Sequence, residues 1–280
     1  MQTSEEIKTM VKEQYSKIAL QDKNQNLSSC CGATACCTEV YNIMADDYNA
    51  LEGYNPEADL GLGCGLPTQF AKIKKGDVVI DLGSGAGNDC FIARAETGET
   101  GKVIGIDMTD AMIDLARNNA EKLNFHNVEF RLGEIETMPV TSKVADVIVS
   151  NCVLNLVPDK NKAFQEIHRV LKPGGHFSIS DVVLVGELPE RIMKTAEMYV
   201  GCISGAIQKD KYLDIIREAG FENITLQKEK PITVPDDILG NYLSSDEIKL
   251  YKESGAGVFS ITVYAEKKKE DCCDKNTCCN

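Results

Sequence analysis

The stretch VVIDLGSGAGND, residues 78–89, decides the fold of this chain. An apolar run typical of a buried strand leads directly into three glycines at alternate positions, Gly83, Gly85 and Gly87, and a helical pattern begins at Asn88. Glycine permits a sharp turn and lets a ligand approach the main chain closely. The G-x-G-x-G spacing is not the G-x-G-x-x-G of dinucleotide-binding folds. The stretch therefore predicts a strand, a ligand-binding loop and a helix in succession.

The alternation of apolar runs and helical patterns continues beyond this stretch. It predicts strands over residues 78–82, 103–107, 128–132, 144–150 and 177–181, and helices over residues 88–96, 109–124 and 160–171. Further patterns predict helices over residues 5–21, 189–199 and 209–219 and strands over residues 224–227 and 259–265. Strands that alternate with helices form parallel sheets. The predicted fold class is therefore α/β, a doubly wound Rossmann-like sheet.

Composition divides the chain into four regions. We expect an N-terminal helix and a cysteine-rich arm in residues 1–68, and a ligand-binding domain in residues 69–184. A smaller C-terminal region for substrate binding is expected in residues 185–270, and residues 271–280 form a polar, cysteine-rich tail. The Gly- and Pro-rich stretch of residues 53–68 is typical of a loop.

Charge and hydropathy restrict the partners. The 280 residues carry a formal net charge of −13, with 43 acidic and 30 basic side chains, and the longest basic run is residues 267–269. A nucleic-acid partner would be repelled. The sequence has neither the apolar core of a secretory signal at its start nor a stretch near the ~20 apolar residues of a membrane span. We expect a cytoplasmic monomer with no nucleic-acid or membrane partner.

Cysteine is the unusual component. The chain has 12 cysteines, many of them in two CC-x4-CC clusters at residues 30–37 and 272–279, and C-x2-C does not occur. The missing C-x2-C spacing argues against an ordinary structural zinc site. In a reducing compartment, thiols remain available for soft-ion binding, redox chemistry or nucleophilic attack. Cys90, in the first turn of a helix that should pack on the sheet, is expected to be structural.

An acid ends the second predicted strand. Asp107 lies where a carboxylate can accept hydrogen bonds from the ribose hydroxyls of a nucleoside ligand, and Glu134 and Ile135, after the third strand, are placed to border its base. This combination resembles the class I S-adenosylmethionine methyltransferases over roughly residues 76–181, and it favours a methyl donor over a nicotinamide cofactor. The expected cofactor-binding residues are Gly83, Ser84, Gly85, Gly87, Asp107, Met108, Glu134, Ile135 and Asn151.

Three cysteines lie in loops around the predicted cofactor site: Cys64 in LGCGLP, Cys152 in SNCVLNLVPD and Cys202 in VGCISGA. Thiolates are soft donors and prefer thiophilic ions. A trivalent arsenic centre accepts three thiolates and keeps a lone pair, which can attack a methyl sulfonium without a general base. These cysteines are therefore candidate arsenic ligands.

Several motifs resemble one family, the arsenite methyltransferases. They are LGCGLP, DLGSGAGNDC, IDMT, SNCVLNLVPDK and GCISGA, which together span about residues 61–206. The resemblance implies As(III), or its thiol conjugates, as the substrate, bound by Cys152 and Cys202. It also implies that Cys64 and one N-terminal cysteine form a catalytic redox pair, reset by a small thiol or a thioredoxin-like reductant.

The N-terminal member of that pair is open among four candidates, Cys30, Cys31, Cys36 and Cys37, and approximate spacing favours Cys36. The C-terminal CC-x4-CC lies outside the motif set. It is either a tail that binds adventitious metal or a device that captures As(III).

Two other functions remain open at this point. One is a C- or O-methyltransferase of the same fold that acts on a small metabolite, with incidental cysteines. The other is a thiol-rich metalloid-binding protein with a vestigial cofactor loop.

Overall fold

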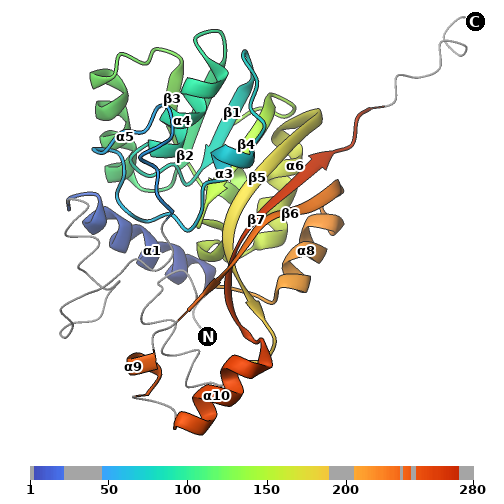
Figure 1. Ribbon diagram of the computed structural model, residues 1–280. Helices are drawn as coiled ribbons and strands as arrows, with labels where there is room; N and C mark the ends of the chain where they lie inside the picture. The colour runs from blue at the N-terminus through green and yellow to red at the C-terminus, as the bar shows by residue number, and fades with distance from the viewer. Residues whose placement is uncertain (1–2, 22–45, 189–204, 234–235, 241–243, 271–280) are drawn as a thin grey trace, which may run out of the picture.

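The structure is a computed structural model, and it describes residues 3–21, 46–188, 205–233, 236–240 and 244–270 (Figure 1). Its centre is a seven-stranded sheet of order β3-β2-β1-β4-β5-β7-β6. The strands are β1 (Val78–Leu82), β2 (Lys102–Asp107), β3 (Val128–Leu132), β4 (Ala145–Asn151), β5 (Leu171–Val185), β6 (Phe221–Ile232) and β7 (Gly257–Lys267). Strands β1 to β5 are parallel, whereas β7 runs antiparallel between β5 and β6.

Helices cover both faces of the sheet (Figure 1). They are α1 (Ser4–Ile18), α3 (Pro67–Phe70), α4 (Asn88–Thr97), α5 (Asp110–Lys122), α6 (Lys160–Val170), α8 (Lys209–Glu218), α9 (Asp236–Leu239) and α10 (Ser245–Ser254). Short 3-10 turns occupy Ile135–Thr137 and Leu154–Leu156. Among the helices that the structure describes, none combines the length and apolarity that a bilayer crossing requires.

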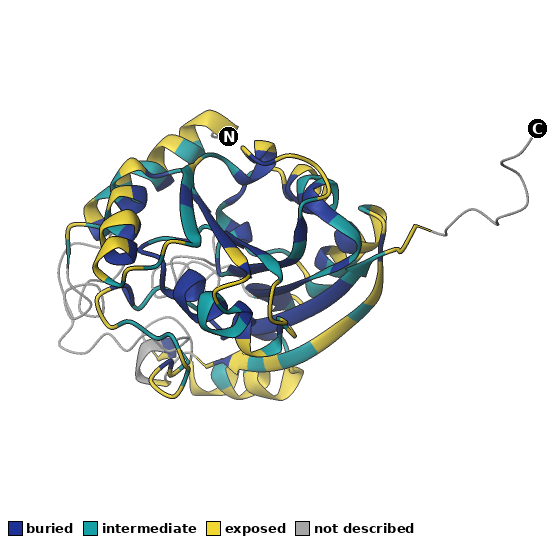
Figure 2. Cartoon of the chain, turned by 90° about the horizontal axis from the view of Figure 1, so that it is seen from above, coloured by how far each residue is buried: buried dark blue, intermediate teal, exposed yellow. Residues whose placement is uncertain are grey.

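Side chains that point alternately to the two faces of the sheet create two apolar layers. Val79 packs with side chains of α4 and α5, while its neighbour Ile80 packs with side chains of α6 and α8 on the opposite face. Both residues are fully buried. Because successive side chains of a strand point to opposite faces, a strand covered on both sides reads as a continuous apolar run. Figure 2 shows the outcome, a sheet with buried central strands and exposed residues on the outer helices, the loops and the edge strand β6.

The parallel part of the sheet agrees with the sequence prediction. β1 and β3 have the predicted bounds, β2 begins one residue earlier than predicted, and β4 is shifted by one residue at both ends. The predicted strands over residues 177–181, 224–227 and 259–265 are shorter than β5, β6 and β7. All three strands are longer because β7 pairs antiparallel with both β5 and β6. The predicted helix over residues 189–199 lies outside the described residues, and α10 was not predicted. The region after residue 185 thus contributes two strands to the same sheet.

The carboxyl ends of β1, β2 and β4 meet at one edge, where open α/β sheets bind ligands. After β1, the amides of Gly83 and Ser84 both donate to the carbonyl of Ile106 in β2, at 2.8 and 3.0 Å. Gly83 has a φ of +66°, and a Cβ atom there would lie 2.3 Å from the Val153 side chain. Glycine is therefore required for the close approach of this turn to the loop that follows β4.

Candidate functional site

A cavity opens at the carboxyl ends of β1, β2 and β4. Eight of the nine predicted cofactor residues line it: Gly83, Ser84, Gly85, Asp107, Met108, Glu134, Ile135 and Asn151. The exception is Gly87, which begins α4 with a φ of +100° and whose Cβ would lie 2.9 Å from the rings of Phe91 and Phe130. Gly87 therefore serves the turn and the packing behind it.

Asp107 is held in a fixed orientation at the end of β2. The amide of Gly85 donates to Oδ2 at 3.1 Å and the amide of Thr109 donates to Oδ1 at 2.8 Å. Burial raises the pKa of Asp107, although these two amides oppose the shift. A carboxylate has about four lone-pair positions, so capacity remains for hydroxyl donors of a ligand. A side chain on Gly85 would meet open space, which leaves room for that ligand beside the acid.

Helix α1 closes one end of the cavity. Lys8 contacts both Glu134 and Glu136, with Nζ–Oε2 distances of 2.8 and 2.6 Å, and Val11 and Tyr15 of the same helix also line the cavity. Partial burial alone would lower the pKa of Lys8, but its hydrogen bonds with the two carboxylates outweigh that effect and raise it. The predicted base-binding acid, Glu134, is therefore ion-paired with the N-terminal helix.

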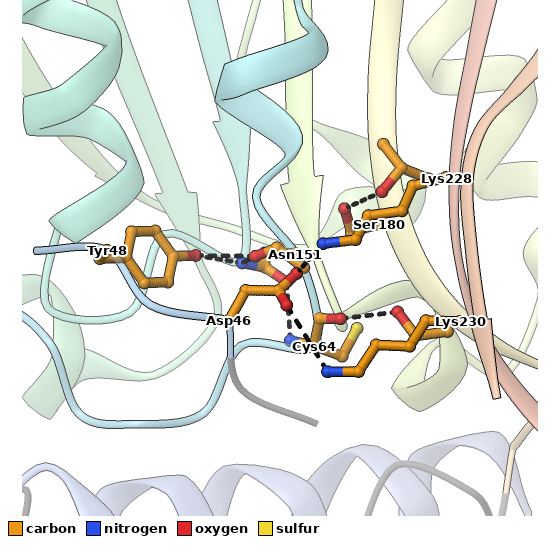
Figure 3. A network of polar contacts seen from close by, with 10 residues as sticks. Asp46, Tyr48, Cys64, Asn151, Ser180, Lys228 and Lys230 are labelled. Carbon is orange, nitrogen blue, oxygen red and sulfur yellow. Dashed lines mark hydrogen bonds and ion pairs between the residues drawn. The ribbon is translucent and has the colours of Figure 1, made fainter. Parts of the chain in front are cut away.

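Asn151 joins three distant segments (Figure 3). Its Oδ1 accepts the amide of Cys64 at 3.0 Å, and its Nδ2 donates to the carbonyl of Gly65 at 2.8 Å and to Oδ2 of Asp89 at 3.2 Å. The same Nδ2 contacts the hydroxyl of Tyr48, which in turn donates to Asp89 at 3.2 Å. The side chain thus fastens the segment around Tyr48 and Cys64 to the end of β4. Its predicted contact with the cofactor stays a prediction.

Cys152 follows β4 directly and is 2% exposed, yet it lines the cavity. Its φ is +60°, in the left-handed region that costs a non-glycine residue about 1–2 kcal/mol. Its amide donates to the carbonyl of Ser180 in β5 at 2.8 Å, so the strained residue is fixed by the sheet. A strained backbone at the mouth of a cavity is typical of a functional residue.

Cys64 lies in the same buried cluster as Cys152, together with Val182, Leu184, Ile232 and Val258. It is 1% exposed, and its carbonyl accepts a hydrogen bond from the hydroxyl of Ser260 at 2.6 Å. The structure therefore brings these two predicted arsenic ligands together. Cys202 and the candidates Cys30, Cys31, Cys36 and Cys37 lie outside the described residues. Within the residues that are described, no three Cys, His, Asp or Glu side chains form a group that could hold a metal ion.

Cys90 is buried in the core, as the sequence predicted. Its thiol donates to Oδ2 of Asp81 at 3.2 Å, and burial, with the nearby Asp81, raises its pKa. Unlike Cys152, Cys90 does not line the cavity, and a protonated thiol enclosed in the core is not suited to chemistry.

Sequence reasoning missed four residues that shape the site: Lys8, Asp46, Tyr48 and Asp89. Asp46 binds Lys228 of β6 at 2.6 Å and approaches Lys230 at 3.6 Å (Figure 3). All four act across long sequence separations and belong to no local pattern. The one available signal was the acid of GAGND directly after the glycine loop.

Comparison with known proteins agrees with this geometry. The profile of a methyltransferase domain matches residues 73–220. The arsenite methyltransferase of Halobacterium salinarum is 40% identical over 267 residues, which cover 89% of this chain and 67% of that protein. That of Aquipseudomonas alcaligenes is 32% identical over 258 residues, which cover 88% and 72%. The chain belongs to the arsenite methyltransferase family.

A solved member of this family has the same fold. The crystal structure of the arsenic(III) S-adenosylmethionine methyltransferase from Chlamydomonas reinhardtii superimposes with a TM-score of 0.61 and 31% identity, covering 74% of this chain and 68% of that one. The architecture around the cavity is thus the fold of an S-adenosylmethionine-dependent methyltransferase.

Asp107 offers the first test of the cofactor site in this family member. Asp107→Asn should weaken S-adenosylmethionine binding about tenfold or more, because a hydrogen bond to a charged group contributes about 1.5–3 kcal/mol. Calorimetric titration measures the dissociation constant, Kd. Asp110→Asn, an exposed acid three residues away, is the matched control and should bind as the wild type does. An unchanged Kd in Asp107→Asn contradicts the assignment.

The backbone of Cys152 gives a second test. Cys152→Gly should be about 1 kcal/mol more stable than Cys152→Ala, because only alanine retains the strain of the left-handed conformation. This order is the reverse of that in a regular helix or strand. Urea denaturation of the two variants measures the difference in unfolding free energy. If alanine is the more stable replacement, the strain at Cys152 is absent.

Proposed function

We propose that this protein transfers methyl groups from S-adenosylmethionine to As(III) bound by cysteine thiolates. The observation that carries the proposal is the position of Cys152, which lines the same cavity as Asp107 and the glycine loop and shares a buried cluster with Cys64. A methyl acceptor held at Cys152 would therefore face a donor bound in that cavity.

The residues of the cavity fit S-adenosylmethionine. Asp107 retains acceptor capacity beside the open space at Gly85. The hydroxyl of Ser84 and Oδ1 of Asp89 are buried without a hydrogen-bond partner among the described residues. Buried polar atoms are normally paired, so unpaired ones along a cavity indicate groups that a ligand satisfies. When bound, the cofactor supplies an electrophilic methyl group on a positively charged sulfur.

The protein's part in the transfer is to hold and orient the acceptor. Methyl transfer is an in-line displacement, so the arsenic lone pair must face the methyl carbon, and two or three sulfur ligands can fix it there. Arsenic already has a lone pair, so no base is required to create the nucleophile. The three histidines of the chain are all described, and none of them lines the cavity. This disfavours an oxygen acceptor that depends on a histidine base.

The proposed redox role of two cysteines follows from the change in the oxidation state of arsenic. When the arsenic lone pair becomes an As–C bond, the formal oxidation state of arsenic rises from III to V. Return to As(III) takes two electrons, which two thiols supply as they lose two protons and form a disulfide. In this proposal the pair is Cys64 and an N-terminal cysteine, with Cys36 favoured, and an external thiol reductant restores both.

Cys202, which lies outside the described residues, is proposed as a further arsenic ligand from the motif GCISGA, and the described residue Gly205 that follows it contacts the loop after Cys152. A Cβ atom on Gly205 would lie 1.8 Å from the carbonyl oxygen of Asn155, so the two backbones are in direct contact. Cys202 precedes Gly205 by three residues, and Cys152 precedes Asn155 by three. Three residues span at most about 10 Å. The amide of Leu184 donates to the carbonyl of Ile207 at 3.0 Å, which fixes this part of the chain to β5.

Replacing single thiols tests the assignment. Cys152→Ser should abolish methylation of both inorganic and monomethylated As(III), because a hydroxyl is a harder donor and is not ionised at neutral pH. Cys64→Ser should stop methylation of inorganic As(III) but spare the monomethylated substrate, which needs one sulfur fewer. Methyl transfer from labelled cofactor measures both rates in the presence of a thiol reductant. Wild-type turnover of either substrate by Cys152→Ser would show that arsenic is held elsewhere.

Gly205 provides an independent test of the contact near Cys202. Gly205→Ala should reduce As(III) binding, because the new methyl group must displace the Asn155 backbone. The near-ultraviolet absorption of arsenic–sulfur bonds measures this binding. The matched control is Gly101→Ala, whose Cβ would lie 1.9 Å from the Thr97 hydroxyl, remote from the cavity. It should lose stability and keep As(III) binding. Equal As(III) binding by both variants contradicts the proposed role of the segment that contains Cys202.

A further inference from the structure

Asp89 has an unused buried carboxylate oxygen at the cavity. The residue is 9% exposed, lies in the first turn of α4 and lines the cavity. Its Oδ2 accepts hydrogen bonds from Tyr48 and Asn151, both at 3.2 Å, whereas Oδ1 has no hydrogen-bond partner among the described residues. Leaving a buried charged acceptor unpaired costs more than leaving a neutral one. The geometry therefore indicates a site for a donor or a cation from a ligand.

The other acids near Asp89 are engaged with protein partners. In the preceding loop, Asp59 accepts from the amide of Gly61 at 2.9 Å and from the hydroxyl of Tyr54 at 3.0 Å. In β1, Asp81 accepts from the thiol of Cys90 at 3.2 Å. Both acids add negative potential to the wall, and of the three only Asp89 has a carboxylate oxygen that is buried without a hydrogen-bond partner among the described residues.

Cations are scarce around this cavity. Among the described residues that line it, Lys8 is the one cation, and it is paired with Glu134 and Glu136. Asp59, Asp81, Asp89 and Asp107 line the rest of the wall. A ligand with a positive charge would therefore meet an uncompensated negative field.

The direction of the bound cofactor follows from the strand ends. Asp107, the proposed ribose acid, ends β2, whereas the acceptor atom belongs at Cys152, after β4. The reactive sulfur must lie toward Cys152. Asp89 is hydrogen-bonded to Asn151, the residue adjacent to Cys152, so it borders the sulfonium and amino-acid half of the cofactor and not the adenosine half.

We propose that Asp89 binds this cationic half, so that the cavity distinguishes S-adenosylmethionine from its product S-adenosylhomocysteine by the sulfonium charge. The inference rests on the proposed cofactor and adds a residue that selects its charge state. Both molecules carry an amino group, but only the methyl donor carries a positive sulfur. Loss of that charge on transfer weakens the attraction to Asp89 and favours release of the product.

Protonation of Asp89 should make the affinity for S-adenosylmethionine depend on pH. Burial raises the pKa of Asp89 to about 6; hydrogen bonds from Asn151 and Tyr48 oppose this shift and Asp59 adds to it. A bound cation favours the ionised carboxylate, so affinity for the donor should be complete above pH 6 and fall as the pH drops below it. Asp81 and Asp107 are the other acids on this wall whose pKa burial raises, so an Asp89 variant is needed to assign the effect.

The test is calorimetric titration of the full chain with each of the two cofactor forms, without As(III). At pH 7.5 the wild type should prefer S-adenosylmethionine, and Asp89→Asn should reduce that preference about tenfold, the equivalent of one pKa unit. Asparagine keeps the shape and the acceptor for Tyr48. The matched control is Asp146→Asn in β4, an acid bound to the amide of Val78 and to Lys172. It should leave the preference unchanged.

A second readout needs no variant. Titrations of the wild type at pH 6 in two buffers of different ionisation enthalpy count the protons released, and S-adenosylmethionine should release more than S-adenosylhomocysteine. Equal release by the two ligands, or an unchanged preference in Asp89→Asn, overturns the role of Asp89 while leaving the cofactor assignment intact. A wild type that binds neither ligand overturns both. Failure to methylate As(III) with normal cofactor binding affects only the proposed acceptor.

Discussion

The hydrogen bonds of the Asn151 side chain are the constraint on which the site depends. One amide accepts from the backbone of Cys64 and donates toward Gly65 and Asp89, thereby joining the loop before α3, the first turn of α4 and the end of β4. The side chain of asparagine supplies both an acceptor and two donors at one position. A carboxylate or an aliphatic side chain cannot form both sets of bonds. The position of Cys64 relative to Cys152 is thus set by directional bonds as well as by packing.

The site contains locally unfavourable features, a strained backbone and unpaired polar atoms, that the surrounding sheet stabilises. Cys152 has a left-handed backbone, and Ser84 and Asp89 keep buried polar atoms that have no hydrogen-bond partner in the described part of the chain. Such features persist only where the surrounding structure determines them strongly. Asn151 pairs with Ser180 of β5 directly before the strained residue, and the amide of Cys152 continues this ladder. The sheet edge at the cavity therefore combines one strained backbone position with two unpaired polar atoms, while the layers behind it are apolar.

The parts of the fold that the sequence predicted are those encoded locally. The buried parallel strands read as apolar runs, and Asp107 could be placed because an acid at the end of a strand occupies a position fixed by topology. The lengths of β5, β6 and β7 were underestimated. In β6 the many exposed residues hide the ends of the strand, whereas β5 and β7 are largely buried and their ends are set by pairing with each other. Lys8 and Tyr48 could not be predicted, because their partners lie 126 and 41 residues away. Neither the hydrophobic periodicity nor a local sequence motif indicates contacts over such separations.

An acidic cavity next to a cluster of thiols raises a question of charge. Thiolates beside Asp81, Asp89 and Asp107 would add negative charge to a wall that is already negative, and like charges in a partly buried site repel strongly. In the proposed reaction, arsenic resolves this conflict. Arsenous acid condenses with thiols by releasing water and no net proton, so the sulfur atoms pass from neutral thiols to neutral arsenic–sulfur bonds. The negative wall then acts on the charge that remains, the sulfonium of the methyl donor, and holds it beside an uncharged nucleophile. In the proposed site, neutral coordination of arsenic by sulfur would therefore be compatible with an acidic wall that selects the positively charged donor.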